Sequence, residues 1–231
     1  MMKTLIVDNI EIKVTKKKIK NINLSVHSPY GEVRISAPYT MKDETIRVFA
    51  LSKVEWIKKQ QEKMKNRKVL APLEFVTGES HYFLGNKYKL NIIWIDKNPA
   101  RVELGESGYI NVYIKQSATT LQKEKLLKEW YRAQLKLLIP PLIKKWEDIM
   151  GVQVEEFGVK QMKTRWGTCN TSAKRIWINL GLGKKPPHCL EYIVVHEMVH
   201  LLERNHNKRF TAYMDQFLPN WPSIKKELND G

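Results

Sequence analysis

The chain has 231 residues, of which 42% are hydrophobic, and it carries a formal net charge of +16. This length is enough for one large domain or two small ones with a buried core. Its two cysteines are too few for a disulfide framework, and no apolar run approaches the roughly 20 residues of a membrane-spanning helix. The charged start does not resemble a signal peptide, so we expect a cytoplasmic protein with no membrane partner.

The basic charge has two interpretations. It is either an ordinary solvated surface or a functional face that associates with a polyanion such as nucleic acid. The lysines and arginines are spread along the chain, and no recognisable nucleic-acid-binding motif accompanies them. The sequence predicts no oligomeric state.

Alternating apolar residues characterise the first half of the chain. Residues 22–38 predict two strands that turn through Ser28–Gly31, and residues 81–96 and 100–115 predict two further strand pairs. Between them, apolar residues at helical spacing from Ile46 to Ile57 predict one amphipathic helix, with a capping box formed by Thr40 and Asp43. We find no internal repeat. Residues 1–116 are therefore expected to form a β-rich N-terminal domain.

Helical periodicity dominates the second half. Residues 121–151 predict two consecutive helices, because Pro140 and Pro141 cannot donate intrahelical hydrogen bonds. Residues 152–162 and 174–182 predict strands on either side of a polar loop, and Pro186 and Pro187 predict the start of another helix. The expected fold class is α+β, with a second domain over residues 117–231.

The stretch HEMVHLLERNH places His196 and His200 four residues apart. On a helix this spacing brings both imidazoles to one face, where they can reach a single ion. Glu197 lies beside them, free to take a proton from metal-activated water. The flanking residues are apolar nearly all round, which predicts a buried helix. The alternatives are ordinary core histidines and a structural zinc site, although no cysteine lies within the motif.

The third metal ligand has two sets of candidates. His206 follows His196 by ten residues, which is the spacing of the pattern HExxHxxGxxH, but Glu203 stands where that pattern has glycine. The turn toward the metal is then expected at Asn205, a residue that tolerates left-handed backbone. The competing scheme takes a carboxylate from a later helix, Asp215 or Glu227. We favour His206 because it needs only a local turn.

Several stretches together resemble the YgjP-like metallopeptidase-domain family, whose relatives include the SprT and WLM metalloproteases. The resemblance is carried by KTRWGTC, WINL, YIVVHEMVHLLERNH and NKRFTAYMDQFLPNW, and more weakly by residues 22–38 and 83–90. It implies a zincin-like metallohydrolase domain with His196, His200 and His206 on zinc and Glu197 as the general base.

The flanking residues supply further candidates. In zincins the strand before the motif helix commonly forms a wall of the substrate cleft, which here predicts residues 176–180. Arg165 could stabilise an oxyanion or bind a substrate carboxylate or phosphate, and the alternative is a structural arginine. The apolar stripe on the helix after His206 is expected to be core, with the Tyr213 hydroxyl as a further catalytic candidate. Cys169 could approach the zinc, but we expect it to be a small buried thiol.

The expected function is peptide hydrolysis by a zinc-dependent metallopeptidase, with a polypeptide as substrate. A nucleotide substrate, through hydrolysis of a phosphoanhydride, is the alternative within the hydrolases. The non-enzymatic alternative is a basic nucleic-acid-binding protein in which zinc only stabilises the fold.

Overall fold

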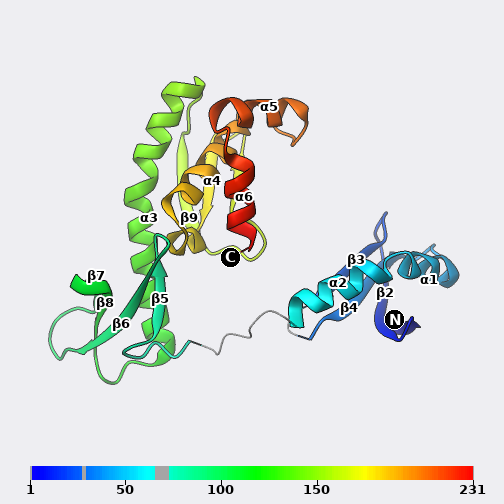
Figure 1. Cartoon of the computed structure of the whole chain (residues 1–231), viewed down its shortest axis with the longest axis horizontal. Coiled ribbons are helices and arrows are strands. Elements are labelled where there is room, and N and C mark those ends of the chain that lie inside the picture. Colours follow the sequence, from blue (N-terminus) through cyan, green and yellow to red (C-terminus); the bar gives the residue numbers. More distant parts are fainter. Residues whose placement is uncertain (1, 28–29, 66–72, 231) are drawn as a thin grey trace. The chain divides into compact units, whose positions relative to one another are not determined.

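The computed structural model describes residues 2–27, 30–65 and 73–230, and the chain forms two compact units, Met1–Pro72 and Leu73–Gly231 (Figure 1). The predicted domain boundary at residue 116 lies inside the second unit. Each unit has its own hydrophobic core.

The first unit contains a four-stranded sheet of order β1-β2-β4-β3. The central pair β2 and β4 is parallel, while β1 with β2 and β3 with β4 form antiparallel hairpins. The predicted hairpin of residues 22–38 is confirmed, although Ser28 and Pro29 of its turn lie outside the described residues. The strands are β1 (Met2–Val7), β2 (Ile10–Lys17), β3 (Asn23–His27) and β4 (Glu32–Pro38).

Two helices, α1 (Asp43–Leu51) and α2 (Val54–Lys65), replace the one predicted helix. The break comes where the Ser52 hydroxyl donates to the Phe49 carbonyl oxygen at 2.8 Å, a local bond that competes with helix continuation. The predicted capping box is also absent, because the N-cap residue is Lys42 and makes no side-chain cap bond. Buried residues of both helices, from Ile46 to Ile57, join the core of the first unit.

The second unit begins with another four-stranded sheet, of order β5-β6-β8-β7. Both predicted strand pairs are confirmed, and the parallel pair β6 and β8 joins the two hairpins. A short 3₁₀ helix, η1 (Glu106–Gly108), connects β7 to β8. The strands are β5 (Ser80–Phe83), β6 (Asn86–Trp94), β7 (Arg101–Leu104) and β8 (Tyr109–Ile114).

The two four-stranded sheets have the same topology, although the sequence contains no detectable internal repeat. In each, a hairpin is followed by a second hairpin that pairs in parallel with the first. The first turns also match, because Asp8 and Asn9 have positive φ, as do Leu84 and Gly85. Since different residues adopt this two-residue turn, the repeat is visible in backbone conformation and pairing and not in the residue pattern.

Helix α3 (Thr120–Met150) is continuous through Pro140 and Pro141, which corrects the prediction of two helices. Both prolines are exposed, so solvent can hydrate the carbonyl groups that they leave unpaired. Thr119 and Gln122 form a capping box at its start. The buried residues keep helical spacing across the prolines and hold the helix together by packing: Leu127, Trp130, Tyr131, Leu135, Ile139, Ile143, Trp146 and Met150.

Helix α3 also explains why the boundary falls before β5. It contacts β7 and β8, which precede it in the chain, and β9 and α4, which follow it (Figure 1). Both sheets of the second unit therefore share one core. The Tyr131 hydroxyl donates to the Tyr82 carbonyl oxygen, and the Leu84 amide donates to the Gly183 carbonyl oxygen at 2.9 Å. The sheet of β5–β8 is therefore part of the unit that holds the histidine motif.

The remaining strands form a three-stranded sheet of order β10-β11-β9, with β9 and β11 parallel. Strand β10 lies inside the predicted polar loop, where pairing with β11 fixes its extended backbone. A further helix, α6, follows the helix that carries Tyr213, and the sequence had not predicted it. The elements are β9 (Glu156–Lys160), β10 (Gly167–Asn170), β11 (Arg175–Asn179), η2 (Leu180–Lys184), α4 (Pro187–Val199), α5 (Lys208–Phe217) and α6 (Trp221–Asp230).

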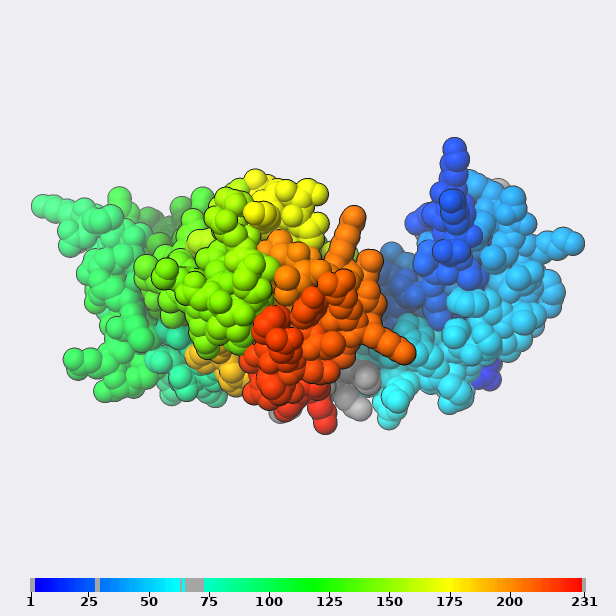
Figure 2. All heavy atoms as spheres, turned by 90° about the horizontal axis from the view of Figure 1, so that it is seen from above, coloured from blue at the N-terminus to red at the C-terminus, as the bar shows by residue number. Residues whose placement is uncertain are grey.

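The C-terminal helices cover α4, since α5 and α6 both contact it. Figure 2 shows these orange and red residues side by side on the surface of the second unit. Among the described residues, no helix combines the length and apolar character needed to cross a bilayer.

Candidate metal centre

Helix α4 carries the histidine motif through the core of the second unit. Pro186 is its N-cap and Pro187 its first residue, as predicted, and a proline there loses no intrahelical hydrogen bond. The helix is buried nearly all round, including Glu197, which is 4% exposed. Helical geometry ends at Val199, with His200 as the C-cap.

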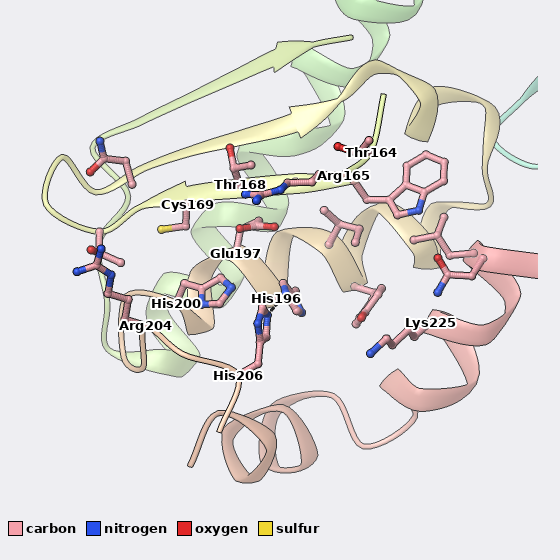
Figure 3. Close-up of a pocket in the computed structure, with 18 of the residues that line it drawn as sticks. Thr164, Arg165, Thr168, Cys169, His196, Glu197, His200, Arg204, His206 and Lys225 are labelled. Carbon is pink, nitrogen blue, oxygen red and sulfur yellow. Dashed lines mark hydrogen bonds between the residues drawn. The ribbon is translucent and has the colours of Figure 1, made fainter. Parts of the chain in front are cut away.

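Three imidazoles converge at the end of this helix (Figure 3). The candidate ligand atoms of His196, His200 and His206 all lie within 4.8 Å of one another, and the Nε2 atoms of His196 and His206 are 2.9 Å apart. Nδ1 of His200 lies 3.2 Å from the Glu203 carbonyl oxygen. When Nδ1 donates this bond, Nε2 is left as the atom with a free lone pair.

Phe210 packs against all three imidazoles. Its ring centroid lies 4.9 Å from that of His196, 4.8 Å from that of His200 and 4.6 Å from that of His206. Phe210 is 4% exposed and stands in the first turn of α5, which Asn207 caps by accepting from the Arg209 and Phe210 amides. Phe210 belongs to the apolar stripe that the sequence predicted to be core, and its ring forms the apolar floor of the histidine cluster.

The turn that returns His206 to the cluster does not use left-handed backbone at Asn205, contrary to our expectation. Asn205 is absent from the described non-glycine residues with positive φ. Its amide instead donates to the Glu203 carboxylate at 3.2 Å, and its carbonyl oxygen accepts from the Asn207 amide at 2.8 Å. Side-chain and turn hydrogen bonds therefore replace the glycine of the HExxHxxGxxH pattern.

The electrostatic environment favours the neutral form of two of the imidazoles, those of His196 and His200. Burial, and then the nearby His200 and His206 rings, lower the pKa of His196 to about 3. Burial also lowers the pKa of His200. A neutral imidazole is the form that binds a metal ion, so the cluster is chemically suited to hold one.

Burial changes the chemistry of Glu197 in the opposite direction. It raises the pKa of this carboxyl to about 8, against the smaller opposing effect of the Arg165 charge. Within the described part of the chain, the Glu197 carboxyl has no hydrogen-bond partner. Gly167 makes room for it, because a Cβ atom at Gly167 would lie 2.5 Å from Glu197 Oε1. No role of this glycine was predicted from the sequence.

A pocket of about 820 Å³ opens over the histidines and Glu197. Its wall is formed by residues 164–172, which include β10, and not by residues 176–180 as we expected. Ile176, Ile178 and Leu180 are buried in the core, because β11 is the central strand and β10 is the edge. Arg204 and Lys225 also line the pocket, on opposite sides of the histidines in Figure 3.

Arg165, which the sequence proposed as a site residue, lines this pocket and lies near Glu197 (Figure 3). Its loop is held by Asn179, a buried residue at the end of β11. The Asn179 side-chain amide donates to the carbonyl oxygens of Arg165 at 2.7 Å and Met162 at 2.9 Å. The sequence did not identify Asn179. Its only signal there is a polar residue at the end of an apolar strand, in the stretch WINL.

The other candidates fall outside the histidine cluster. The Tyr213 hydroxyl accepts from Arg209 at 3.2 Å and is not among the described lining residues. Asp215 accepts from the Trp221 indole at 2.8 Å, and Glu227 lies 2.7 Å from His188 Nε2. The tyrosine that does line the pocket is Tyr192, one helical turn before His196.

Cys169 also lines the pocket, and it is half-buried and not fully buried as we expected. Burial, and then the Glu197 charge, raise the pKa of its thiol to about 11. The Cys169 side chain is therefore a neutral thiol at neutral pH, which is a weak metal ligand.

Three imidazoles beside a buried carboxyl are the donor set of a metal-dependent hydrolase. A family model described as YgjP-like, metallopeptidase domain, matches residues 20–231. The chain belongs to this family, and the membership supports a metal-dependent peptidase in general terms.

Comparisons with individual proteins add little. A search of curated protein sequences finds no match. Among solved structures, the chain is similar to the metallopeptidase zymogen abylysin of Pyrococcus abyssi, with 18% sequence identity and a TM-score of 0.37. The similarity covers 39% of this chain and 90% of that one.

Proposed function

We propose that this protein is a zinc-dependent metallopeptidase of the HExxHxxxxxH type. His196, His200 and His206 hold the ion, and Glu197 is the general base. The observation that carries the proposal is the convergence of three candidate ligand atoms within 4.8 Å beside a buried carboxyl. Three imidazole ligands with a further position open to water or substrate are typical of catalytic zinc.

Zinc, when bound, would lower the pKa of a coordinated water toward about 7 and polarise the scissile carbonyl group. Glu197 supplies the proton transfers. Burial gives Glu197 a high proton affinity, and the positive charge of a bound zinc would favour its ionised form. The carboxylate can then accept the proton of the attacking water and return it to the leaving amine. Gly167 keeps the space that this carboxylate occupies.

The substrate is held along β10. This strand is at the edge of its sheet and lines the pocket, so an extended polypeptide could add to it through main-chain hydrogen bonds. Arg165 and Tyr192 are pocket-lining donors for the developing oxyanion. Burial raises the pKa of Tyr192 to about 12, so its hydroxyl keeps the proton that it would donate. Tyr213 has no role in this scheme.

Parallel assays of the zinc-loaded protein and its Glu197→Gln variant test the proposal. The wild type should generate new N-termini from unfolded casein, while nucleoside triphosphates release neither phosphate nor pyrophosphate. In Glu197→Gln, kcat should fall roughly 10²- to 10⁴-fold, because an amide cannot accept the proton, while zinc content and melting temperature stay nearly unchanged. Full turnover by the variant, or nucleotide hydrolysis without proteolysis, would show the proposal to be wrong.

A further inference from the structure

A second cavity, of about 390 Å³, adjoins the loop that carries Arg165. Residues 164–166 line both this cavity and the pocket over the histidines. Its other walls come from the first half of α3, from η2, from the segment around Phe75 and from residues 161–163. Its volume is within the range of small-ligand pockets and is enough for a large side chain.

The floor of this cavity is apolar. Phe75, Leu127, Tyr131 and Leu180 are all less than 10% exposed and belong to the core of the second unit. Trp166 forms the partition toward the histidine pocket, and Gly181 leaves room for its ring, since a Cβ atom there would lie 3.1 Å from the indole. An apolar side chain would therefore lose water on entering and pack against this floor.

The rim, in contrast, is cationic. Lys128, Lys163, Arg165 and Lys184 line it, and the one acidic residue among its described lining, Glu124, pairs with Lys128 at 2.7 Å. Lys163, Arg165 and Lys184 make no ion pair with any described carboxylate.

Lys184 is the rim residue whose charged form a bound anion would stabilise most. Its ammonium lies 5.7 Å from the centroid of the Tyr131 ring, a position that holds it above the apolar floor. Part of Lys184 is exposed to solvent. Loss of solvent around the rest of the side chain, and then the Lys128 charge, lower its pKa. A bound carboxylate would offset both effects.

The location of the cavity follows from the chain order. Strand β10 begins at Gly167, directly after the shared residues 164–166. A polypeptide laid along β10 would therefore leave the strand at its Gly167 end and pass over this loop. Figure 3 shows Thr164 beside Arg165 on this loop.

We infer that this cavity is a substrate subsite that binds a large apolar side chain with a carboxylate next to it. The apolar floor takes the side chain, while Lys184 and Lys163 on the rim bind the carboxylate. The carboxylate can be the side chain of Asp or Glu or the C-terminal end of the peptide. This inference rests on the proposed peptidase function and adds the substrate class.

Peptide binding to the full-length, zinc-loaded Glu197→Gln protein tests the subsite without turnover. Fluorescein-labelled hexapeptides would carry Phe-Asp, Phe-Asn or Ala-Asp at their centre with an amidated C-terminus, and a fourth would end in Phe with a free carboxylate. We expect at least one carboxylate peptide with Phe to bind about tenfold more tightly than the uncharged Phe-Asn peptide, the effect of one charge-assisted hydrogen bond. Tight binding of Phe-Asp identifies a side-chain carboxylate, and tight binding of the free acid alone identifies a chain end.

Lys184→Gln in the same background should remove this tenfold preference, and Lys163→Gln should reduce it. Lys144→Gln is the matched control, because Lys144 is exposed on α3 and does not line the cavity. Melting temperatures verify that each variant is folded. Equal affinity for all four peptides, or a preference that survives Lys184→Gln and Lys163→Gln, overturns the subsite.

The wild-type cleavage map of casein separates this inference from the proposed function. Cleavage sites enriched in a large apolar residue beside Asp, Glu or the chain end support both. Cleavage without such enrichment overturns the subsite and leaves the peptidase proposal standing. Binding with the tenfold preference but no cleavage supports the subsite and contradicts the peptidase proposal.

Discussion

The two four-stranded sheets share strand order, strand direction and a two-residue first turn, yet they have different surroundings. The sheet of β1–β4 is covered by two short helices and closes a small core of its own. The sheet of β5–β8 packs against the 31-residue helix α3, and this helix also contacts the three-stranded sheet and α4. The sheet topology by itself therefore does not create the candidate metal centre.

The second sheet supports the centre through a specific contact. The turn between β5 and β6 meets the start of α4, where a Cβ atom at Gly85 would lie 2.8 Å from Pro186 Cγ. The equivalent turn of the first sheet, Asp8–Asn9, has its own partner in an ion pair of Asp8 with Lys58 of α2 at 2.7 Å. Equivalent turns thus stabilise different neighbours, one of them the helix that carries the histidines.

Among the changes that test the difference between the two sheets, removal of a candidate metal ligand should have the largest effect. In His206→Ala we expect zinc affinity to fall by more than about 100-fold, since even the loss of a residue that only hydrogen-bonds to a ligand can reduce metal affinity by that factor. Asp215→Ala should keep wild-type affinity, because Asp215 bonds the Trp221 indole instead. Competition with a chromophoric chelator measures both variants. The reverse result would favour a carboxylate as the third ligand.

The space beside Glu197 gives the next largest effect. Gly167→Ala places a Cβ atom 2.5 Å from Glu197 Oε1, so the carboxyl must move. We expect kcat to fall roughly 100-fold, the lower part of the range for general-base catalysis, while zinc content is retained. Thr168→Ala on the same strand removes atoms and should lose far less. Equal turnover of Gly167→Ala and wild type would contradict the assigned position of the base.

The turn contact can be isolated with two glycines of the second sheet. Gly85 and Gly108 both have φ of +83°, so alanine strains the backbone at each by about 1–2 kcal/mol. Only Gly85→Ala also collides with Pro186, which should add about 1–3 kcal/mol to the loss of unfolding free energy. Urea unfolding of the two variants measures the difference. Equal losses would mean that the turn does not support α4.

The smallest effect concerns acid sensitivity of the first sheet. Hydrogen bonds from Arg34 to Glu32 and from Lys3 to Asp43 hold the pKa of each carboxyl at about 2, below the ordinary values of 4.5 and 3.8. Because the folded pKa is lowered, this stabilisation is present above about pH 4.5 and is lost as the pH falls toward 2. Both groups are exposed, so the change should be small and screened by salt.

Glu32→Gln should flatten the dependence of first-unit stability on pH between about 4.5 and 2. Its effect is followed by a circular-dichroism melt at each pH. An unchanged pH profile in this variant would contradict the assignment.

The sequence by itself determined the features that depend on local spacing. Alternation predicted three of the five antiparallel strand pairs among the described residues, and the i, i+4 spacing predicted that His196 and His200 share a helix face. The apolar residues around the motif predicted a buried helix, and Pro187 marked its start. These features need no knowledge of distant contacts, because side-chain direction repeats with the period of the element.

Only the tertiary structure decided the features that depend on distant residues. Helix α3 continues through Pro140 and Pro141 because its buried face packs against both sheets of the second unit. The wall of the pocket is β10 because β11 pairs on both sides and becomes the central strand. Gly167 matters only because Glu197 lies against it, 30 residues later in the chain. Each of these outcomes is set by packing between segments that share no local pattern.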